Sequence, residues 1–153
     1  GALYAYLYVR LAQLGVDVVG ESQLVGFPSQ FPSVSMVDWT NGKPSARLTI
    51  LELIKNNLGP GDDFAETEVR SNGIPADADA IEAQAYTSGN QRKLLLINQR
   101  NREVSVELPK ECVGATLETI GGASPDLVKQ EVGDSKLRLL PFSVSIVTLK
   151  EAV

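Results

Sequence analysis

Polar side chains that could bind a ligand follow the short apolar run VDVV at residues 16–19. Glu21, Ser22 and Gln23 come directly after Gly20, and a long loop with two prolines leads to Trp39, the single tryptophan of the chain. A β-branched run of this kind indicates a short strand. The strand would therefore deliver a carboxylate and an amide at its end. Two interpretations stay open: these residues contact a ligand, or they are ordinary turn residues and Trp39 packs against the next helix.

Nucleophilic and metal chemistry have few candidates in this sequence. The chain has no histidine and one cysteine, Cys112, so Cys–His and Ser–His–Asp systems and an internal disulfide are excluded within it. We expect Cys112 to pack as a small apolar residue. Asp77 and Asp79 could contribute to a calcium site, but they lack the ligand count of an EF-hand, and we interpret them as solvated loop acids. We therefore expect no metal and no cofactor.

The other carboxylates give no acid–base pair by spacing alone. Asp62 and Asp63 follow the turn at residues 59–61. Several glutamates alternate with apolar residues and are predicted on the outward faces of strands: Glu66, Glu68, Glu82, Glu103, Glu107 and Glu118.

Composition indicates a globular chain. Of its 153 residues 43% are hydrophobic and 22% charged, which suits one or two small domains with a real core. The net charge of −5 and the absence of a basic run disfavour nucleic acid as a partner. The apolar start, residues 1–15, is interrupted by Arg10, lacks the features of a signal peptide and is too short to cross a bilayer, so no membrane partner is expected.

Two helices are predicted in the first part of the chain. Leucines and tyrosines recur at helical spacing over residues 2–14, and Gly15 suits the end of that helix. A second apolar face runs from Leu48 to Leu58, with Pro44 in the first turn and Gly-Pro-Gly at residues 59–61 after its end. Residues 1–61 therefore form a segment that runs helix, strand, long loop, helix.

The pattern changes after residue 61. Short strands with Gly, Asn, Asp or Ser turns recur every eight to twelve residues, which is typical of an antiparallel sandwich. The predicted fold class is α+β, with a sandwich of seven or eight strands over residues 62–153 as a second domain. Residues 62–150 are predicted to form the stable unit of the chain.

The order of these pieces resembles the C-terminal part of clan A retaining glycoside hydrolases, in which a (β/α)8 barrel is followed by a β-sandwich. The matching pieces are GVDVVGESQLVG, FPSVSMVDWTNGKPSAR, LIKNNLGPGD, RKLLLINQRNREVSVELP and LRLLPFSVSIVTLK, which together cover most of the chain. The resemblance implies that residues 2–14 are the seventh barrel helix, 16–20 the eighth strand and 43–58 the eighth helix.

The resemblance also implies a division of roles. The two catalytic carboxylates of such enzymes sit at the ends of the fourth and seventh strands, upstream of Gly1, so no catalytic residue is expected in this chain. Glu21, Gln23 and Trp39 would lie on the active face and contact carbohydrate. The chain would then supply scaffold and one rim of the cleft.

Other functions remain open. A stand-alone carbohydrate-binding or protein-interaction sandwich module is the alternative, although aromatic residues make up only 6% of the chain. The first helix spreads apolar side chains around its cylinder, which predicts either self-association through residues 2–19 or binding to an upstream barrel segment. The sequence does not indicate a cellular location.

Overall fold

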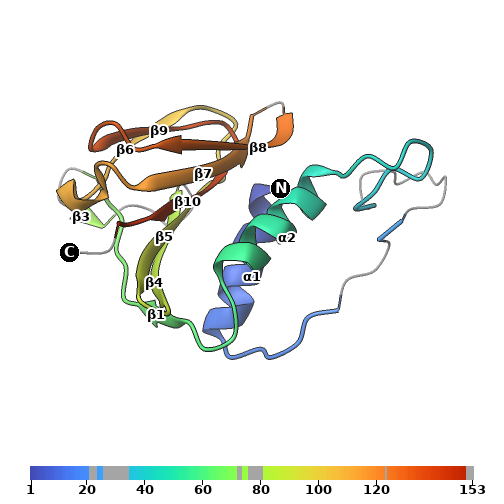
Figure 1. Cartoon of the computed structure of the whole chain (residues 1–153), viewed down its shortest axis with the longest axis horizontal. Helices are drawn as coiled ribbons and strands as arrows, with labels where there is room; N and C mark the ends of the chain where they lie inside the picture. The colour runs from blue at the N-terminus through green and yellow to red at the C-terminus, as the bar shows by residue number, and fades with distance from the viewer. Residues whose placement is uncertain (21–23, 26–34, 72–73, 76–80, 123, 151–153) are drawn as a thin grey trace.

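The computed structural model places two helices beside an antiparallel β-sandwich (Figure 1). It describes residues 1–20, 24–25, 35–71, 74–75, 81–122 and 124–150. The α+β fold class and the sandwich that the sequence predicts are confirmed. No helix in these residues has the length and hydrophobicity needed to span a bilayer.

Both helices follow the predicted apolar patterns. Helix α1 spans Ala2–Gln13 and ends in a Schellman motif, in which Gly15 adopts φ 75° and Val16 N–H donates to the Leu11 carbonyl. Helix α2 spans Ala46–Asn57, with Ser45 as its N-cap residue. Its C-cap, Leu58, is extended, and the chain turns at residues 59–61 toward the sandwich.

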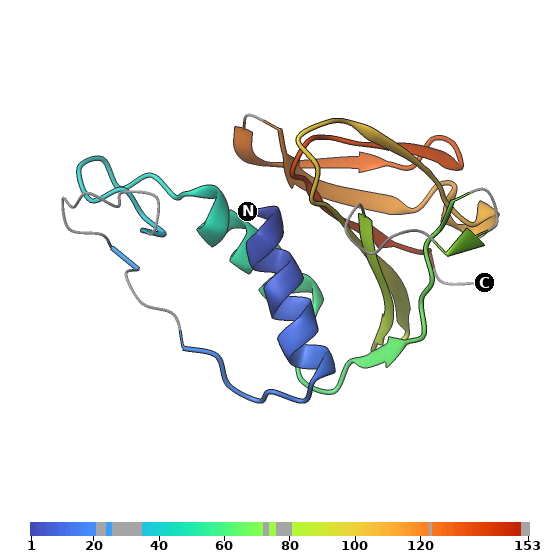
Figure 2. The same ribbon diagram turned by 180° about the vertical axis from the view of Figure 1, so that it is seen from behind.

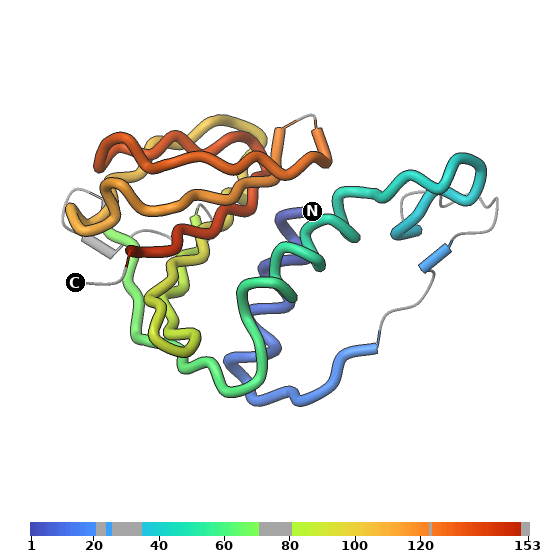
Figure 3. Tube along the Cα trace, viewed as in Figure 1, coloured from blue at the N-terminus to red at the C-terminus, as the bar shows by residue number. Residues whose placement is uncertain are grey.

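Six strands form the main sheet, in which every neighbouring pair is antiparallel. Two further pairs are β6 (Val104–Glu107) with β9 (Lys136–Leu139) and β2 (Arg70–Ser71) with β3 (Ile74–Pro75). The tube in Figure 3 follows the path of the chain from the helices through the strands. A 3₁₀ helix at Lys110–Cys112 carries the buried Cys112, as expected for a small apolar residue. Across the main sheet the strands are β1 (Asp63–Ala65), β4 (Ile81–Ser88), β5 (Gln91–Asn98), β10 (Val144–Thr148), β7 (Thr116–Gly121) and β8 (Ser124–Glu131).

The main sheet is covered on both faces, which gives two cores. The helices lie against one face and the β6–β9 pair against the other (Figures 1 and 2). Strand β5 contributes to both cores, because Leu95 and Ile97 face the helices while Leu96 faces the β6–β9 pair. Because both faces of the sheet are covered, successive side chains along its central strands are buried whichever face they point to.

The helix-side core crosses the predicted domain boundary at residue 61. It joins Ala5 and Val9 of α1 and Ile54 of α2 to Leu95 and Ile146 of the sheet. The division into 1–61 and 62–153 stays a prediction. Without the helices, the sandwich would lose the apolar contacts of this shared core.

The strand predicted over residues 16–20 is wrong. These residues adopt no regular secondary structure, and Val16, Val18 and Val19 are exposed at 41%, 83% and 52%. A strand needs a neighbour to satisfy its backbone groups, and the described residues provide none at this point. The apolar composition of the run is nevertheless that of a strand buried on both faces.

Candidate functional site

A hydrogen-bonded turn presents Trp39 just before α2. Asp38 N–H donates to the Lys43 carbonyl (2.8 Å), and Gly42 N–H donates to the Asp38 carbonyl (2.8 Å). The Asp38 carboxylate accepts from the backbone N–H of Thr40 (2.8 Å) and from its hydroxyl. Such Asx-type bonding fixes a turn without help from a sheet. The Trp39 side chain is 56% exposed on it, so most of the indole is open to solvent.

The same bonds favour the charged form of Asp38. The hydroxyl of Thr40 and then its backbone N–H hold the pKa of this carboxyl below its usual range. Asn41 adds a further donor, 3.2 Å from Asp38 Oδ2. Asp38 therefore acts as the anionic centre of the turn. Met36, two residues before it, is buried, with 2% of its surface exposed.

The other two predicted binding residues, Glu21 and Gln23, lie outside the described residues, as do Asp77 and Asp79. Of the predicted site, Trp39 alone is therefore placed. Its role as a carbohydrate contact stays a prediction.

An apolar surface lies on the outer side of α1 and continues into residues 16–19. Leu3, Leu7 and Leu14 are exposed at 63%, 49% and 78%, while Ala2, Ala5 and Val9 form the buried side of the helix. Small side chains on the inner side bring the helix close to α2 and the sheet. We call Leu3, Leu7, Leu14 and the exposed valines of residues 16–19 the α1 surface.

Two glutamates predicted to face solvent do not. Glu82 is 7% exposed and pairs with Arg10 of α1, with 2.9 Å between Oε2 and Nη2. The side chain of Glu118 is 16% exposed. The prediction is wrong because alternation marks an outward face only when one face of the sheet is solvated, and here both faces are covered. Burial raises the pKa of Glu82, and Arg10 partly opposes that shift.

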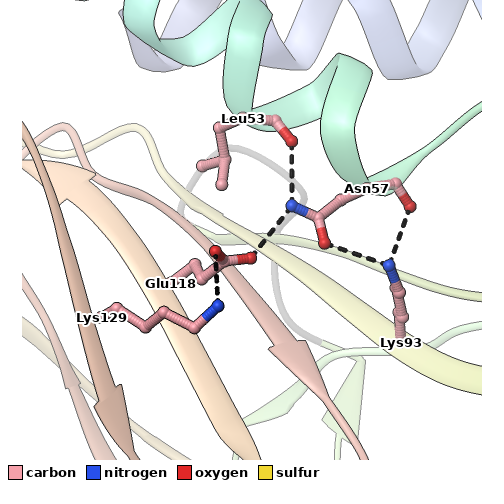
Figure 4. Close-up of polar contacts among 5 residues, drawn as sticks. All are labelled: Leu53, Asn57, Lys93, Glu118 and Lys129. Carbon is pink, nitrogen blue, oxygen red and sulfur yellow. Dashed lines mark hydrogen bonds and ion pairs between the residues drawn. The ribbon is translucent and has the colours of Figure 1, made fainter.

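A polar network joins the end of α2 to the sheet (Figure 4). Asn57 Nδ2 donates to the Leu53 carbonyl (3.0 Å) and to Glu118 Oε2 (3.1 Å), while Lys93 Nζ donates to Asn57 Oδ1 (3.1 Å). Lys129 Nζ lies 3.3 Å from Glu118 Oε1. Two cations and one carboxylate are thus linked through a buried amide, which satisfies polar groups inside the helix–sheet contact. We interpret the network as structural.

Tyr86 lies in the same core and carries no hydrogen bond on its hydroxyl within the described residues. Burial raises the pKa of Tyr86, and the charges of Asp62 and Glu118 raise it further. The phenol therefore stays neutral, and it is not a candidate acid or base at ordinary pH.

A cleft of about 820 Å³ opens on the other face of the sandwich, between β4, β5 and β6. Its walls include Ala83, Leu94, Leu96 and Val106, and an Arg92–Glu111 ion pair with 3.3 Å between charged atoms lies at its border. Among the described residues, no group of three or more His, Cys, Asp or Glu side chains could hold a metal ion. The lining mixes apolar side chains with charged ones, among them Glu66, Glu107 and Lys93.

Comparison with solved structures relates this arrangement to a group of xylanases. A glycoside hydrolase family 30 endoxylanase from Clostridium papyrosolvens C71 matches 74% of this chain at a TM-score of 0.53 and 15% identity. A family 30 subfamily 8 xylanase from Clostridium acetobutylicum matches 76% at 0.53 and 15% identity. The catalytic domain of xylanase C from Talaromyces cellulolyticus, also of family 30, matches 77% at 0.57 and 11% identity. The fold is shared with part of these enzymes.

The chain spans only 30%, 30% and 28% of the lengths of these three proteins. The predicted resemblance to the C-terminal part of a glycoside hydrolase is thus confirmed at the level of the fold. Neither a protein-family model nor a curated protein sequence matches the chain.

Proposed function

We propose that this chain is the non-catalytic C-terminal portion of a glycoside hydrolase, where it provides scaffold and one rim of a carbohydrate-binding cleft. The observation that carries the proposal is the fold match, in which about three quarters of this chain corresponds to less than a third of each xylanase. Catalytic carboxylates would then lie in the remaining part of the parent enzyme.

The turn at residues 38–43 supports the assignment of a rim. In a (β/α)8 barrel, substrate binds where the loops lead from strands into helices. Trp39 stands on a braced turn directly before α2, with its indole exposed. An exposed indole on a fixed turn offers a flat apolar face to the C–H groups of a sugar ring, and Glu21 and Gln23 of the same loop would bind hydroxyl groups.

The α1 surface supports the presence of further structure around the chain. Arg10 is the one charged residue within α1, and it is turned toward Glu82, so the outer side of the helix is uncharged. Exposed apolar surface of this kind usually binds a partner. We propose that an upstream barrel segment covers the α1 surface in the parent protein and that a second copy covers it when the chain is alone.

Activity and tryptophan fluorescence test the proposed role in binding. The matched proteins are named xylanases, so aryl xylosides and xylo-oligosaccharides are the first compounds to use. We expect no turnover by the chain, and a shift in emission as xylo-oligosaccharide is added, because Trp39 is the single tryptophan. Glycerol at equal osmolality is the control. Turnover that is abolished by Glu21→Gln would show that the chain is catalytic, and an unchanged emission would remove Trp39 from the rim.

Light scattering tests the proposed partner surface. The mean mass of the chain should rise with concentration, and Leu7→Gln combined with Leu14→Gln should suppress the rise. Leu127→Gln on β8 is the matched control, because Leu127 is exposed to a similar extent (47%) outside the α1 surface. A chain that stays monomeric at high concentration would contradict the assignment of the α1 surface as a self-association face.

A further inference from the structure

Phe142 combines an unfavourable backbone conformation with an exposed ring. It has φ 50°, the one positive φ of a non-glycine residue among those described, and its side chain is 49% exposed. A bulky side chain is disfavoured in this region, where glycine or asparagine is usual. Burial of the ring would offset the strain, but half of the ring lies in solvent. Folding stability therefore does not account for a phenylalanine here, and strained exposed residues of this type cluster at functional sites.

The turn that holds Phe142 is fixed by hydrogen bonds to the end of β5 and to the two neighbouring turns. Phe142 N–H donates to the Arg100 carbonyl (3.0 Å), and the Pro141 carbonyl accepts from Gly122 N–H (3.0 Å). Asn98, which is fully buried, donates to the carbonyls of Arg102 and Leu140, both at 2.8 Å. The ring of Phe142 is thus carried by a backbone that is connected to the β5–β6 and β7–β8 turns.

The turns that are hydrogen-bonded to the backbone at residues 140–142 carry one more exposed apolar side chain and several cationic residues. Leu140 is 37% exposed and lies beside Gly122, while Arg100 and Arg102 are exposed in the β5–β6 turn. Arg138 of β9 forms an ion pair with Glu103, which belongs to the same β5–β6 turn. On a chain of net charge −5, this end of the sandwich carries an excess of arginine.

The same end of the sandwich lies toward the start of the helices. In both ribbon views, the β7–β8 turn is at the end of the sandwich nearest the N-terminus of α1, and α2 begins on that side as well (Figures 1 and 2). In a (β/α)8 barrel this is the side on which substrate binds. Gly122 of the β7–β8 turn donates to the carbonyl of Pro141, the neighbour of Phe142, so the turn at residues 140–142 lies toward the end at which both helices begin.

We propose that Phe142 anchors a second carbohydrate-binding surface, formed by the turns at residues 99–103, 121–122 and 140–142, which takes one or two sugar rings of a polysaccharide strand. The ring of Phe142 packs on the C–H face of a sugar, and the guanidinium groups of Arg100 and Arg102 donate to its hydroxyl groups. This inference rests on the proposed function, because it extends the rim of the same cleft.

The size of the surface favours a sugar over a protein partner. A stable protein interface needs roughly 800 Å² on each side, with a cluster of apolar anchors. Here Phe142 and Leu140 are the exposed large apolar residues of the three turns, which suffices for one or two sugar rings. A single rigid aromatic residue with hydrogen-bond donors beside it matches the alternating apolar and hydroxylated surfaces of a sugar.

Depletion of the full chain from solution by insoluble xylan tests the proposal. The wild-type chain should bind, and Phe142→Asn should lower the partition coefficient by about tenfold, as expected for the loss of one stacked ring. Asparagine tolerates positive φ, so the Tm of Phe142→Asn should be unchanged or higher. Phe142→Tyr keeps the ring and should bind like wild type. Leu127→Asn, a substitution at a similarly exposed leucine of β8, should also bind like wild type.

Three results would overturn the inference: a wild-type chain that insoluble xylan does not deplete, equal depletion of wild type and Phe142→Asn, or a loss of self-association in Phe142→Asn measured by light scattering. The last result would assign Phe142 to an interface between copies. If the emission of Trp39 shifts with xylo-oligosaccharide while xylan depletes Phe142→Asn as much as wild type, this inference alone fails. If depletion depends on Phe142 while the Trp39 response is absent, the rim proposed around Trp39 fails.

Discussion

Gly121 lies where the backbones of two segments of the sandwich approach each other closely. A Cβ atom at this position would lie 2.5 Å from Ser143 Cα, a backbone atom that cannot move aside. We therefore expect Gly121→Ala to lower the free energy of unfolding by about 1–3 kcal/mol, the usual cost of overpacking. Chemical denaturation measures this value.

Gly133→Ala is the matched control for this substitution. A Cβ atom at Gly133 would meet no atom within 4 Å, so alanine there should be neutral or raise the free energy of unfolding by about 0.4–1 kcal/mol. Equal losses of stability in both variants would contradict the close contact between Gly121 and Ser143.

Single residues were predictable where local chemistry decides their role. Gly15 at the end of α1 and the buried Cys112 follow from conformational preference and polarity. Phe142 was not predictable, because a turn after Pro141 calls for glycine or asparagine at positive φ, and nothing in the sequence marks phenylalanine there. Glu82 and Glu118 were wrongly predicted to face solvent. Their hydrogen-bond partners, Arg10 and Asn57, lie 72 and 61 positions away in the sequence, so local alternation could not indicate them.

At the scale of elements, periodicity predicted both helices and most strands, and it failed at residues 16–20. The pattern of VDVV describes a buried strand, but pairing requires a neighbour that this chain does not supply within the described residues. Polar contacts between elements were equally hidden. Arg10 and Gln13 of α1 bond to Glu82 and Gln84 of β4, and only the packing of α1 on the sheet creates those pairs.

The contact between α1 and β4 predicts a dependence of stability on pH. The pKa of Glu82 is raised in the folded chain, so its contribution is fully present below its unfolded pKa and is lost as pH rises through the folded value. Relative to wild type, Glu82→Gln should therefore be more stable at pH 7 than it is at pH 4. Urea unfolding of both proteins at the two pH values gives this difference, because all other groups titrate alike. A relative loss of stability toward pH 7 would mean that the attraction of Arg10 outweighs burial.

At the scale of the whole molecule, the helix-side core predicts the result of truncation. Removing residues 1–61 would expose one face of the main sheet, including Leu95, Ile97, Ile120, Val144 and Ile146. Burial of each such side chain contributes about 1.5–3 kcal/mol, and five together approach the 5–15 kcal/mol by which a domain is stable. We expect a 62–150 fragment to lose the cooperative thermal transition that the full chain shows by circular dichroism. A sharp transition in the fragment would confirm the predicted boundary at residue 61.

The fold class was predictable at this scale because strand spacing and helix periodicity both survive in a single sequence. The extent of the shared core was not, because it depends on which face of the sheet the helices cover. The same limit holds for the α1 surface, because only the packing of α1 decides which of its leucines stay exposed among the described residues.

The sequence of the source gene upstream of the Gly1 codon tests the central proposal most directly. If the chain is the C-terminal portion of a glycoside hydrolase, the reading frame continues upstream for about 250 residues with alternating strands and helices. By resemblance to retaining clan A enzymes, one glutamate should follow an asparagine at the end of one strand, and a second should end a later strand. A start codon in frame immediately before Gly1, with no separate barrel segment encoded beside it, would contradict the proposal.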